Sequence, residues 1–493
     1  MAPFVIRKRQ YINLPMLLRV VGYLLLIESL FMVIPLLVAV IHDNESFVPF
    51  LICIGITGAS GFGMTLIKPK VRDTGKREAI LLTSFTWVVL SLFGMLPFMF
   101  YSTHLSVTDA FFEIMSGFTT TGASVLNTLD NVPRCILVWR CVIQWIGGLG
   151  IILFTLAVVP MLNYAGGMQL FNAEVTGITH DKLRPRVSYT AKGLWGVYAI
   201  LTALLIVLLT FSEMDFYDAL CYGLSTMSTG GFANSDMSIQ MYDSYYIKIV
   251  MVVFMFLGGV NFALLYNAAI GKPKQLLKNT TLKVYMWLTL VCYVLLALNI
   301  LVKGLAHNAA DLTIDPLFQT VSLLSSTGIT EPDFADWGSL AMVVTIIMMF
   351  MGACAGSTSG GAKIDRFIVV FKFLKNEFFK MMHPNAVTTV SLNGKGTPSA
   401  IVHKTIAFIF VYIIVIVAGG MALCLLGLPL KDGFFIALSA ISNTGLGTDV
   451  TGVAGNFAYV PDIAKWLLSF IMLVGRLELF TVLLVFTPAF WKK

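Results

Sequence analysis

The sequence predicts an all-α polytopic membrane protein with about ten transmembrane helices. Of its 493 residues, 57% are hydrophobic and only 12% are charged, and the mean hydropathy is +0.85. Such a chain has too little polar surface to cover a soluble fold. Apolar stretches of about 20 residues, long enough to cross a bilayer, recur along the chain. No polar stretch is long enough for a separate soluble domain.

A short motif that occurs four times is the second observation behind this prediction. Each copy starts with Asp, continues through about ten mostly apolar residues, which is three helical turns, and ends in a polar residue followed by Thr-Gly. The copies are 109–122, 218–230, 315–328 and 432–445. Recurrence at a spacing of about 100 residues indicates one structural unit used four times.

The motif has the composition of a helix that ends inside a membrane. An Asp can cap the free N–H groups of a helix, and ten helical residues span about 15 Å, half the hydrocarbon thickness of a bilayer. Such a half-helix directs the negative end of its dipole at the midplane. Irregular backbone is allowed at that depth only where it is buried or lines a watery path. Four such segments around one axis would form a carbonyl ring that can replace the water shell of a cation.

The ends of the four copies are therefore the predicted selectivity filter. Its residues are Thr120, Thr121, Gly122, Ala123, Ser228, Thr229, Gly230, Gly231, Ser326, Thr327, Gly328, Ile329, Asn443, Thr444, Gly445 and Leu446. The alternative is four ordinary helix C-caps that use Gly, which does not explain the recurring upstream Asp. The second copy is one residue shorter, so either Gly230 or Gly231 could be its filter glycine, and the Thr before Gly230 favours Gly230.

The rest of the chain is predicted to follow from this repeat. Two apolar runs come first, at about 17–41 and 47–67, and neither is followed by the motif. Each repeat then has a span, a half-helix and a second span. The predicted parts are a two-span extension at 1–78 and pore repeats at 79–192, 193–283, 284–402 and 403–493, with the second spans at about 139–162, 246–268, 339–374 and 463–489.

The distribution of Lys and Arg predicts the orientation. The basic loops between the repeats, 163–192, 269–283 and 375–402, fall on the same side as the basic N-terminus and the final Lys-Lys pair. The positive-inside rule makes that side the cytoplasm. Both termini are then cytoplasmic, and the half-helices enter from the outer face.

Five stretches resemble the superfamily of bacterial potassium transporters that contains the Trk, Ktr and Kdp membrane subunits. Within it, the chain is most similar to the TrkH/TrkG type, whose two extra N-terminal spans it shares. The stretches are AFFEIMSGFTTTGAS at 110–124, QWIGGLGIILFTLAVVP at 144–160, MSTGGF at 227–232, GACAGSTSGGAK at 352–363 and GRLELFTVLLVFTPAFW at 475–491.

This resemblance implies potassium uptake across the bacterial cytoplasmic (inner) membrane, with K⁺ as the transported ion bound at the filter. It also implies a homodimer and a TrkA-like cytoplasmic nucleotide-binding ring protein that controls gating. Nucleotide is then expected only on that partner, with no covalently bound cofactor and no nucleic acid. Within transport, a weakly selective K⁺/Na⁺ channel and a sodium-dependent Ktr-like carrier remain alternatives.

A run of small residues at 352–362 is predicted to form an intramembrane gate loop. Glycines disfavour a helix there by about 1 kcal/mol each relative to Ala, and the matching segment in the TrkH type acts as the gate. Packing of small residues between helices is the alternative, and a phosphate loop is excluded because the Gly-Lys-Ser/Thr order is missing. The gate residues are Gly352, Gly356, Ser357, Thr358, Ser359, Gly360, Gly361 and Arg476.

Charged residues inside apolar stretches are the remaining candidates. Arg476 is one, since a charge in a membrane is costly and is a functional candidate by default. The resemblance implies that it projects toward the pore below the filter, and a structural ion pair is the alternative. Glu28, Glu113, Arg140 and Lys248 are expected to pair or to extend toward the interface. The apolar stretches contain no nucleophile–base pair or metal spacing, so an enzyme is not expected.

Overall fold

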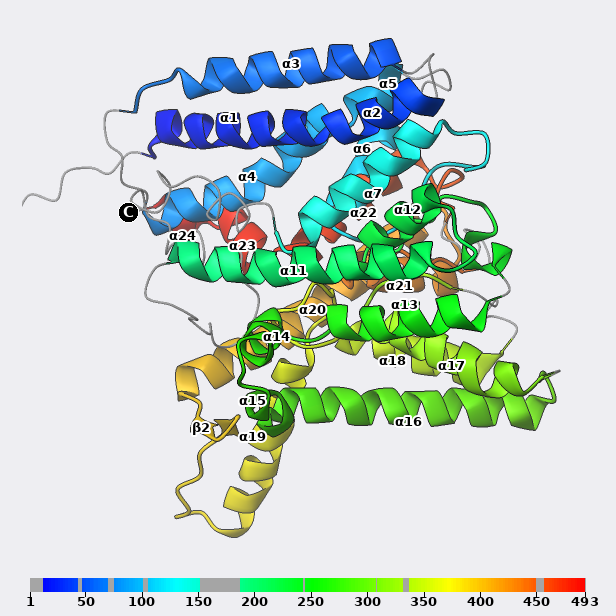
Figure 1. Cartoon of the computed structure of the whole chain (residues 1–493). Coiled ribbons are helices and arrows are strands. Elements are labelled where there is room, and N and C mark those ends of the chain that lie inside the picture. Colours follow the sequence, from blue (N-terminus) through cyan, green and yellow to red (C-terminus); the bar gives the residue numbers. More distant parts are fainter. Residues whose placement is uncertain are drawn as a thin grey trace, which may run out of the picture.

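A computed structural model provides the coordinates. It describes residues 12–42, 47–69, 75–100, 105–150, 187–242, 244–306, 308–330, 337–448 and 456–492. This part of the chain is almost entirely helical (Figure 1). The basic N-terminal segment 1–11 and most of the predicted loop 163–192, on which the orientation partly rests, lie outside the described residues.

The chain begins with a pair of antiparallel helical spans that pack side by side (Figure 1). They are built from α1 (Leu14–Phe31), α2 (Val33–His42) and α3 (Phe47–Thr65). Asn13 caps α1 by accepting the Met16 N–H at 3.3 Å. Gly22 of α1 and Gly61 of α3 let the two backbones approach closely, because a Cβ on Gly22 would lie 2.7 Å from the Gly61 carbonyl oxygen.

One order of helices then occurs four times: a long helix, a short buried helix and a second helix. We call these groups repeats 1 to 4. Repeat 1 has α4 (Lys76–Gly94), α5 (Leu96–Phe100), α6 (Val107–Phe118) and α7 (Arg134–Gly148). Repeat 2 has α11 (Val187–Thr210), α12 (Phe216–Met227), η2 (Ser238–Met241), α13 (Tyr245–Gly258), α14 (Phe262–Ala269) and α15 (Lys274–Lys278).

The last two repeats have the same order with additions after the second helix. Repeat 3 has α16 (Thr280–Lys303), α17 (Ala309–Leu324), α18 (Ser339–Met351) and α19 (Ile364–Met382), followed by the hairpin β1 (Ser391–Leu392) and β2 (Lys395–Gly396). Repeat 4 has α20 (Ser399–Leu425), α21 (Leu430–Ile441), α22 (Asp462–Arg476), α23 (Phe480–Leu483), η3 (Leu484–Phe486) and α24 (Pro488–Trp491). The two-residue hairpin strands are the described exception to the all-α prediction. With α19 they project from the helical body (Figure 1).

The four short helices, α6, α12, α17 and α21, sit in a closed circle of helix packing. Each packs against the long first helix of its own repeat, namely α4, α11, α16 and α20 respectively. Each also packs against the second helix of the preceding repeat, in the pairs α7–α12, α13–α17, α18–α21 and α22–α6. Since α22 of repeat 4 contacts α6 of repeat 1, the order closes on itself and brings the four short helices around a common centre.

Six helices among the described residues are long and apolar enough to cross a membrane. Counting each of two sharply bent helix pairs as one further span gives eight. The chain is therefore an integral membrane protein, while the predicted number of ten is not reached by this criterion. The second helices α7 and α18 fall short of it, because they have only 15 and 13 residues, respectively.

The prediction of continuous second spans was wrong for repeats 2 and 4, whereas the interruption in repeat 3 is predicted from its small residues. The stretch 246–268 is bent by 104° between α13 and α14, 463–489 is bent by 113° after α22, and 339–374 is divided between α18 and α19. Hydropathy does not reveal the bends, because the helices on both sides of each bend are apolar. The end of α22 lies against the backbone of α21, since a Cβ on Gly475 would lie 2.1 Å from the Ile441 carbonyl oxygen.

The glycine crossing of α1 and α3 provides a test of this packing. Gly61→Ala should lower the melting temperature of the purified protein, because its Cβ would lie 2.9 Å from the Gly22 carbonyl oxygen and such overpacking costs about 1–3 kcal/mol. Gly55→Ala is the matched control, since nothing lies within 4 Å of a Cβ at this position in the same helix. Thermal unfolding in detergent measures both. Equal melting temperatures for the two variants would contradict the crossing.

Candidate functional site

The four short helices end in the same backbone conformation. The residue after each helix, Thr119, Ser228, Ser325 or Ser442, has a φ between −74° and −81°. The next residue has a positive φ in every repeat: 53° at Thr120, 54° at Thr229, 56° at Ser326 and 52° at Asn443. The residue after that donates its N–H to a carbonyl five residues back, at 2.8–3.0 Å. This is a Schellman termination, with a strained non-glycine residue in the left-handed region.

A glycine follows the helix termination in each repeat, and helix termination does not explain why it is glycine. Four glycines two residues beyond the strained position also have a positive φ: Gly122 at 85°, Gly231 at 82°, Gly328 at 74° and Gly445 at 77°. The helix has already been terminated before them, so the C-cap alternative accounts for the strained residue and not for the glycine. We call these four the ring glycines.

The ring glycines face the backbone of the next repeat. A Cβ on Gly122 would lie 2.3 Å from the carbonyl oxygen of Gly230, and one on Gly231 would lie 2.0 Å from that of Thr327. The corresponding distances are 2.1 Å from Gly328 to Thr444 and 2.1 Å from Gly445 back to Thr121. The contacts run from repeat 1 to 2, 3, 4 and back to 1. The four loops therefore form a closed ring, in which no residue with a side chain fits at these positions.

The structure corrects the alignment of repeat 2. The sequence favoured Gly230 as the filter glycine, but Gly231 has the positive φ and the contact to the next repeat. Gly230 occupies the place of Thr121, Thr327 and Thr444, and its carbonyl oxygen faces Gly122. The sequence alignment placed Thr229 with the threonines before the other glycines. Thr229 instead occupies the strained position, which is Thr, Ser or Asn in the other repeats. The residue after the ring glycine of repeat 2 is consequently Phe232. The equivalent residues of the other repeats are Ala123, Ile329 and Leu446.

The Asp at the start of each motif copy does not cap the helix as predicted. The N-cap residues are Ser106, Asp215, Asn308 and Pro429. Asp109, Asp218 and Asp432 lie three residues later, in the first turn, where a carboxylate still favours the helix dipole. Asp315 lies inside α17, which begins earlier than predicted.

These carboxylates instead connect the short helices to their surroundings. Asp109 accepts a hydrogen bond from the Lys465 ammonium of α22 at 2.6 Å, and Asp315 pairs with Lys248 of α13 at 3.3 Å. Both lysines come from the second helix of the preceding repeat. Asp218 binds Asn234 and Tyr242, and Asp432 binds Thr448, all on the segments that follow the ring glycines. The carboxylates thus hold the repeats and the loops together.

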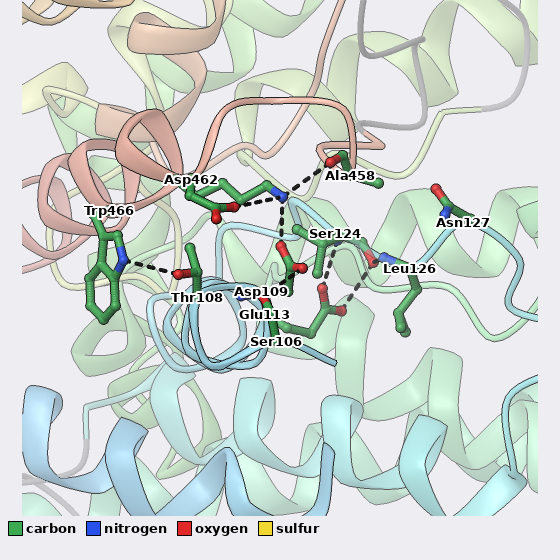
Figure 2. Close-up of polar contacts among 12 residues, drawn as sticks. Ser106, Thr108, Asp109, Glu113, Ser124, Leu126, Asn127, Ala458, Asp462 and Trp466 are labelled. Atoms are coloured by element: carbon green, nitrogen blue, oxygen red, sulfur yellow. Dashed lines mark hydrogen bonds and ion pairs between the residues drawn. The ribbon is translucent and has the colours of Figure 1, made fainter. Parts of the chain in front are cut away.

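Glu113 and Arg140 form a buried ion pair behind the loop of repeat 1. The guanidinium Nε lies 2.7 Å from the carboxylate, and both side chains are at most 1% exposed. Glu113 also accepts the Ser124 hydroxyl at 3.0 Å (Figure 2). It accepts the Val125 N–H at 2.8 Å as well. The pair therefore fixes the backbone just beyond Gly122. Glu28 is also buried, and its carboxylate has no hydrogen-bond partner within the described residues.

The small-residue segment 352–362 lies against the ends of three short helices. The Thr358 hydroxyl donates to the carbonyls of Met227 at 3.3 Å and Gly258 at 3.1 Å in repeat 2. The Gly360 N–H donates to the Ser326 hydroxyl at 2.5 Å, and the Gly361 N–H donates to the Ser442 carbonyl at 3.0 Å. The segment interrupts the helix between α18 and α19, as its composition predicts.

Arg476 connects this segment to repeat 1. Its guanidinium donates to the Thr358 carbonyl at 2.8 Å, to the Gly147 carbonyl at 2.7 Å and to the Gly148 carbonyl. Glu478, two residues on, pairs with Arg366 at 2.5 Å. Segment 352–362 and Arg476 together contact the ends of helices from all four repeats.

Backbone oxygens, rather than acidic or sulfur side chains, are the groups that this centre offers to a ligand. Among the described residues, no group of three or more His, Cys, Asp and Glu side chains is placed to hold a metal ion. A monovalent cation can instead be held by carbonyl oxygens alone. Fold and site together define an integral membrane protein with four similar helical repeats closed around a backbone ring.

Comparisons with known proteins identify the family. Residues 47–493 match the family described as "TrkH: Cation transport protein". The potassium uptake protein TrkH of Salmonella typhimurium is 36% identical over 481 residues, which are 96% of this chain and 99% of that protein. TrkG of Escherichia coli is 31% identical over 478 residues, 96% and 97% of the two chains. The chain therefore belongs to the TrkH family of cation transport proteins, which are not enzymes.

A solved structure supports the same assignment. The crystal structure of the potassium transporter TrkH from Vibrio parahaemolyticus superimposes with a TM-score of 0.87 and 32% sequence identity, covering 97% of this chain and 100% of that one. The similarity extends over essentially the whole length of both proteins, so the family membership applies to the N-terminal helices as well as to the four repeats.

The ring geometry predicts a large difference between two glycines of repeat 3. Gly328→Ala should lower the melting temperature strongly, because its Cβ must displace a backbone oxygen at 2.1 Å, which costs about 3 kcal/mol or more. Gly304→Ala is the matched control: its φ of 66° is similar, but nothing lies within 4 Å of its Cβ. It should cost only the left-handed strain of about 1–2 kcal/mol. Similar melting temperatures would show that Gly328 does not contact repeat 4 closely.

Proposed function

We propose that this chain is the ion-conducting subunit of a potassium-uptake system. The closed ring of glycine–carbonyl contacts carries the proposal, since four equivalent loops around one centre are the arrangement in which backbone oxygens can replace the hydration shell of a cation. The carboxyl ends of four short helices meet at this ring and add negative dipole ends. The relatives are potassium uptake proteins by name. In this proposal K⁺ is the substrate, and residues 120–123, 229–232, 326–329 and 443–446 form the filter, with repeat 2 shifted by one residue from the sequence-based prediction.

The proposed membrane arrangement extends the helix count. With α7 and α18 as further spans, the chain crosses the cytoplasmic membrane ten times, and α6, α12, α17 and α21 are re-entrant pore helices entering from outside. Both termini then lie in the cytoplasm with the basic loops 269–283 and 375–402. The parts of the chain are the extension 1–78 and the repeats 79–192, 193–283, 284–402 and 403–493.

In this arrangement, segment 352–362 and Arg476 form the gate below the filter. The hydrogen bonds to the ends of the short helices would hold the segment across the pore, and the guanidinium would place a positive charge in the path of the cation. Movement of the segment requires breaking the contacts of Thr358, Gly360 and Gly361, so their strength sets how closed the pore is.

The system is proposed to include partners. The relatives are named as members of a Trk system, and we propose a homodimer of this chain that docks a TrkA-like nucleotide-binding ring protein on its cytoplasmic loops. The chain itself then needs no nucleotide. With its β1–β2 hairpin, α19 projects from the helical body (Figure 1), and the exposed residues of α19 lie toward its C-terminal end. This projection is the proposed contact for that ring.

Uptake of ⁸⁶Rb⁺ into liposomes that contain this chain alone tests the proposed function. Competing K⁺ should reduce uptake at lower concentration than Na⁺, and Gly328→Ser should abolish this difference or the uptake itself, because the serine side chain cannot fit in the ring. Gly304→Ser is the control and should behave as wild type. Equal competition by both ions would favour the alternative of a weakly selective channel. The observation behind that alternative is that repeat 2 has Gly230 where the other repeats have Thr before the ring glycine. Uptake that is absent with and without a ring protein would contradict the proposal.

Removing the arginine tests the gate. Arg476→Gln should increase basal ⁸⁶Rb⁺ uptake severalfold, since it removes a positive charge and releases the Thr358 carbonyl from repeat 1. Arg77→Gln is the matched control, because Arg77 also donates to a backbone carbonyl, that of Lys492 at 2.7 Å, but lies far from the ring. Unchanged or lower flux in a folded Arg476→Gln protein would count against a closing role.

A further inference from the structure

Repeat 2 lacks a side chain that the other three repeats have next to the ring glycine. The residue before the ring glycine is Thr121 in repeat 1, Thr327 in repeat 3 and Thr444 in repeat 4. Each threonine hydroxyl is hydrogen-bonded to the hydroxyl two residues earlier, at 2.8, 2.7 and 2.9 Å respectively. Repeat 2 has Gly230 at this place, so its loop cannot make this contact.

The side chain of Gln144 occupies the place of the missing threonine. A Cβ built on Gly230 would lie 2.4 Å from the Gln144 amide carbon, and its three nearest atoms all belong to this amide. Gln144 comes from α7 of repeat 1 and is fully buried. The filling group therefore crosses the boundary between two repeats.

The second helices of the four repeats show that this glutamine is specific to one boundary. They end in matching segments, QWIGG at 144–148, MFLGG at 255–259, MFMGA at 349–353 and MLVGR at 472–476. The position of Gln144 is thus Met255, Met349 and Met472 in the other repeats, all at most 1% exposed. Each second helix packs on the short helix of the next repeat. The one boundary with Gln in place of Met is the one where Gly replaces Thr.

The Gln144 amide holds the peptide groups on both sides of the ring glycine Gly231. Its Nε2 donates to the Gly230 carbonyl at 2.7 Å, and its Oε1 accepts the Phe232 N–H at 3.2 Å. Oε1 also accepts the Ser225 hydroxyl of α12 at 3.0 Å. Two successive glycines leave a peptide group free to rotate, because neither has a Cβ. A bond to each flanking peptide removes that freedom.

We propose that Gln144 is a positioning residue for ion selectivity, which replaces the absent threonine and fixes the carbonyl orientation of repeat 2. The inference rests on the proposed function, since a fixed backbone matters for selectivity only if this ring binds the ion. In this inference Gly230 stands where the other repeats have Thr, and the Gln144 side chain compensates for the lost threonine. The backbone is then fixed in all four loops of the ring, although in repeat 2 it is fixed by a side chain from the neighbouring repeat.

Ion binding to the purified full chain tests this without requiring an open gate. The melting temperature is titrated with KCl and with NaCl, since an ion that binds only the folded protein stabilises it by RT ln(1 + c/Kd) at an ion concentration c. Wild type should need less K⁺ than Na⁺ for the same shift. Gln144→Met should move this ratio toward one by up to about tenfold, the upper range for one net hydrogen bond. Gly230→Thr alone should lower the melting temperature, because its side chain overlaps the amide.

The double variant Gln144→Met/Gly230→Thr gives the decisive result, because it reproduces the Met and Thr pattern of the other three boundaries. It should regain the wild-type K⁺/Na⁺ ratio. Gln319→Met is the control: Gln319 is also fully buried in repeat 3, but its amide has no hydrogen-bond partner among the described residues, and the ratio should stay unchanged. A wild-type ratio in Gln144→Met, an equal change in Gln319→Met, or a double variant no better than Gln144→Met would each overturn the inference. A wild type without K⁺ preference would instead refute the selective ring itself, and the inference with it.

Discussion

The close approach of four glycines to the carbonyls of neighbouring repeats is the constraint on which this structure depends. A Cβ at any of them would lie 2.0–2.3 Å from a backbone oxygen. This distance fixes where each short helix can end and which repeat it meets, and it requires the helices behind to pack closely enough to keep the ring closed. The glycines at the ends of the second helices serve the same purpose, since Gly147 and Gly475 lie directly against the short helices.

Several buried ion pairs hold this ring from the outside. Glu113 with Arg140 supports the loop of repeat 1, while Lys248 and Lys465 bind carboxylates at the short helices of the next repeats. An ion pair in a low-dielectric interior contributes little net stability but is costly to break. The pairs therefore fix the arrangement of the repeats more than they stabilise the fold as a whole.

The four repeats are similar without being equal, and their differences lie at the centre of the molecule. Only repeat 3 has the long small-residue segment, and only repeat 4 has an arginine where the other second helices have Gly or Ala. These two departures meet in the hydrogen bond between Arg476 and the Thr358 carbonyl. The third departure, Gly230 with Gln144, concerns the ring itself.

The sequence by itself determined the membrane class, the four repeats and the small-residue break, because hydropathy, spacing and glycine content are local properties of the chain. The family followed from its motifs for the same reason. It did not determine that Gly231 rather than Gly230 is the ring glycine, that the aspartates bind neighbouring segments instead of capping helices, or that the second spans of repeats 2 and 4 are sharply bent. Each of these depends on which backbone atom of another repeat lies nearby. Gln144 was missed because one glutamine in an apolar helix carries no signal until Gly230, 86 residues away, is placed beside it.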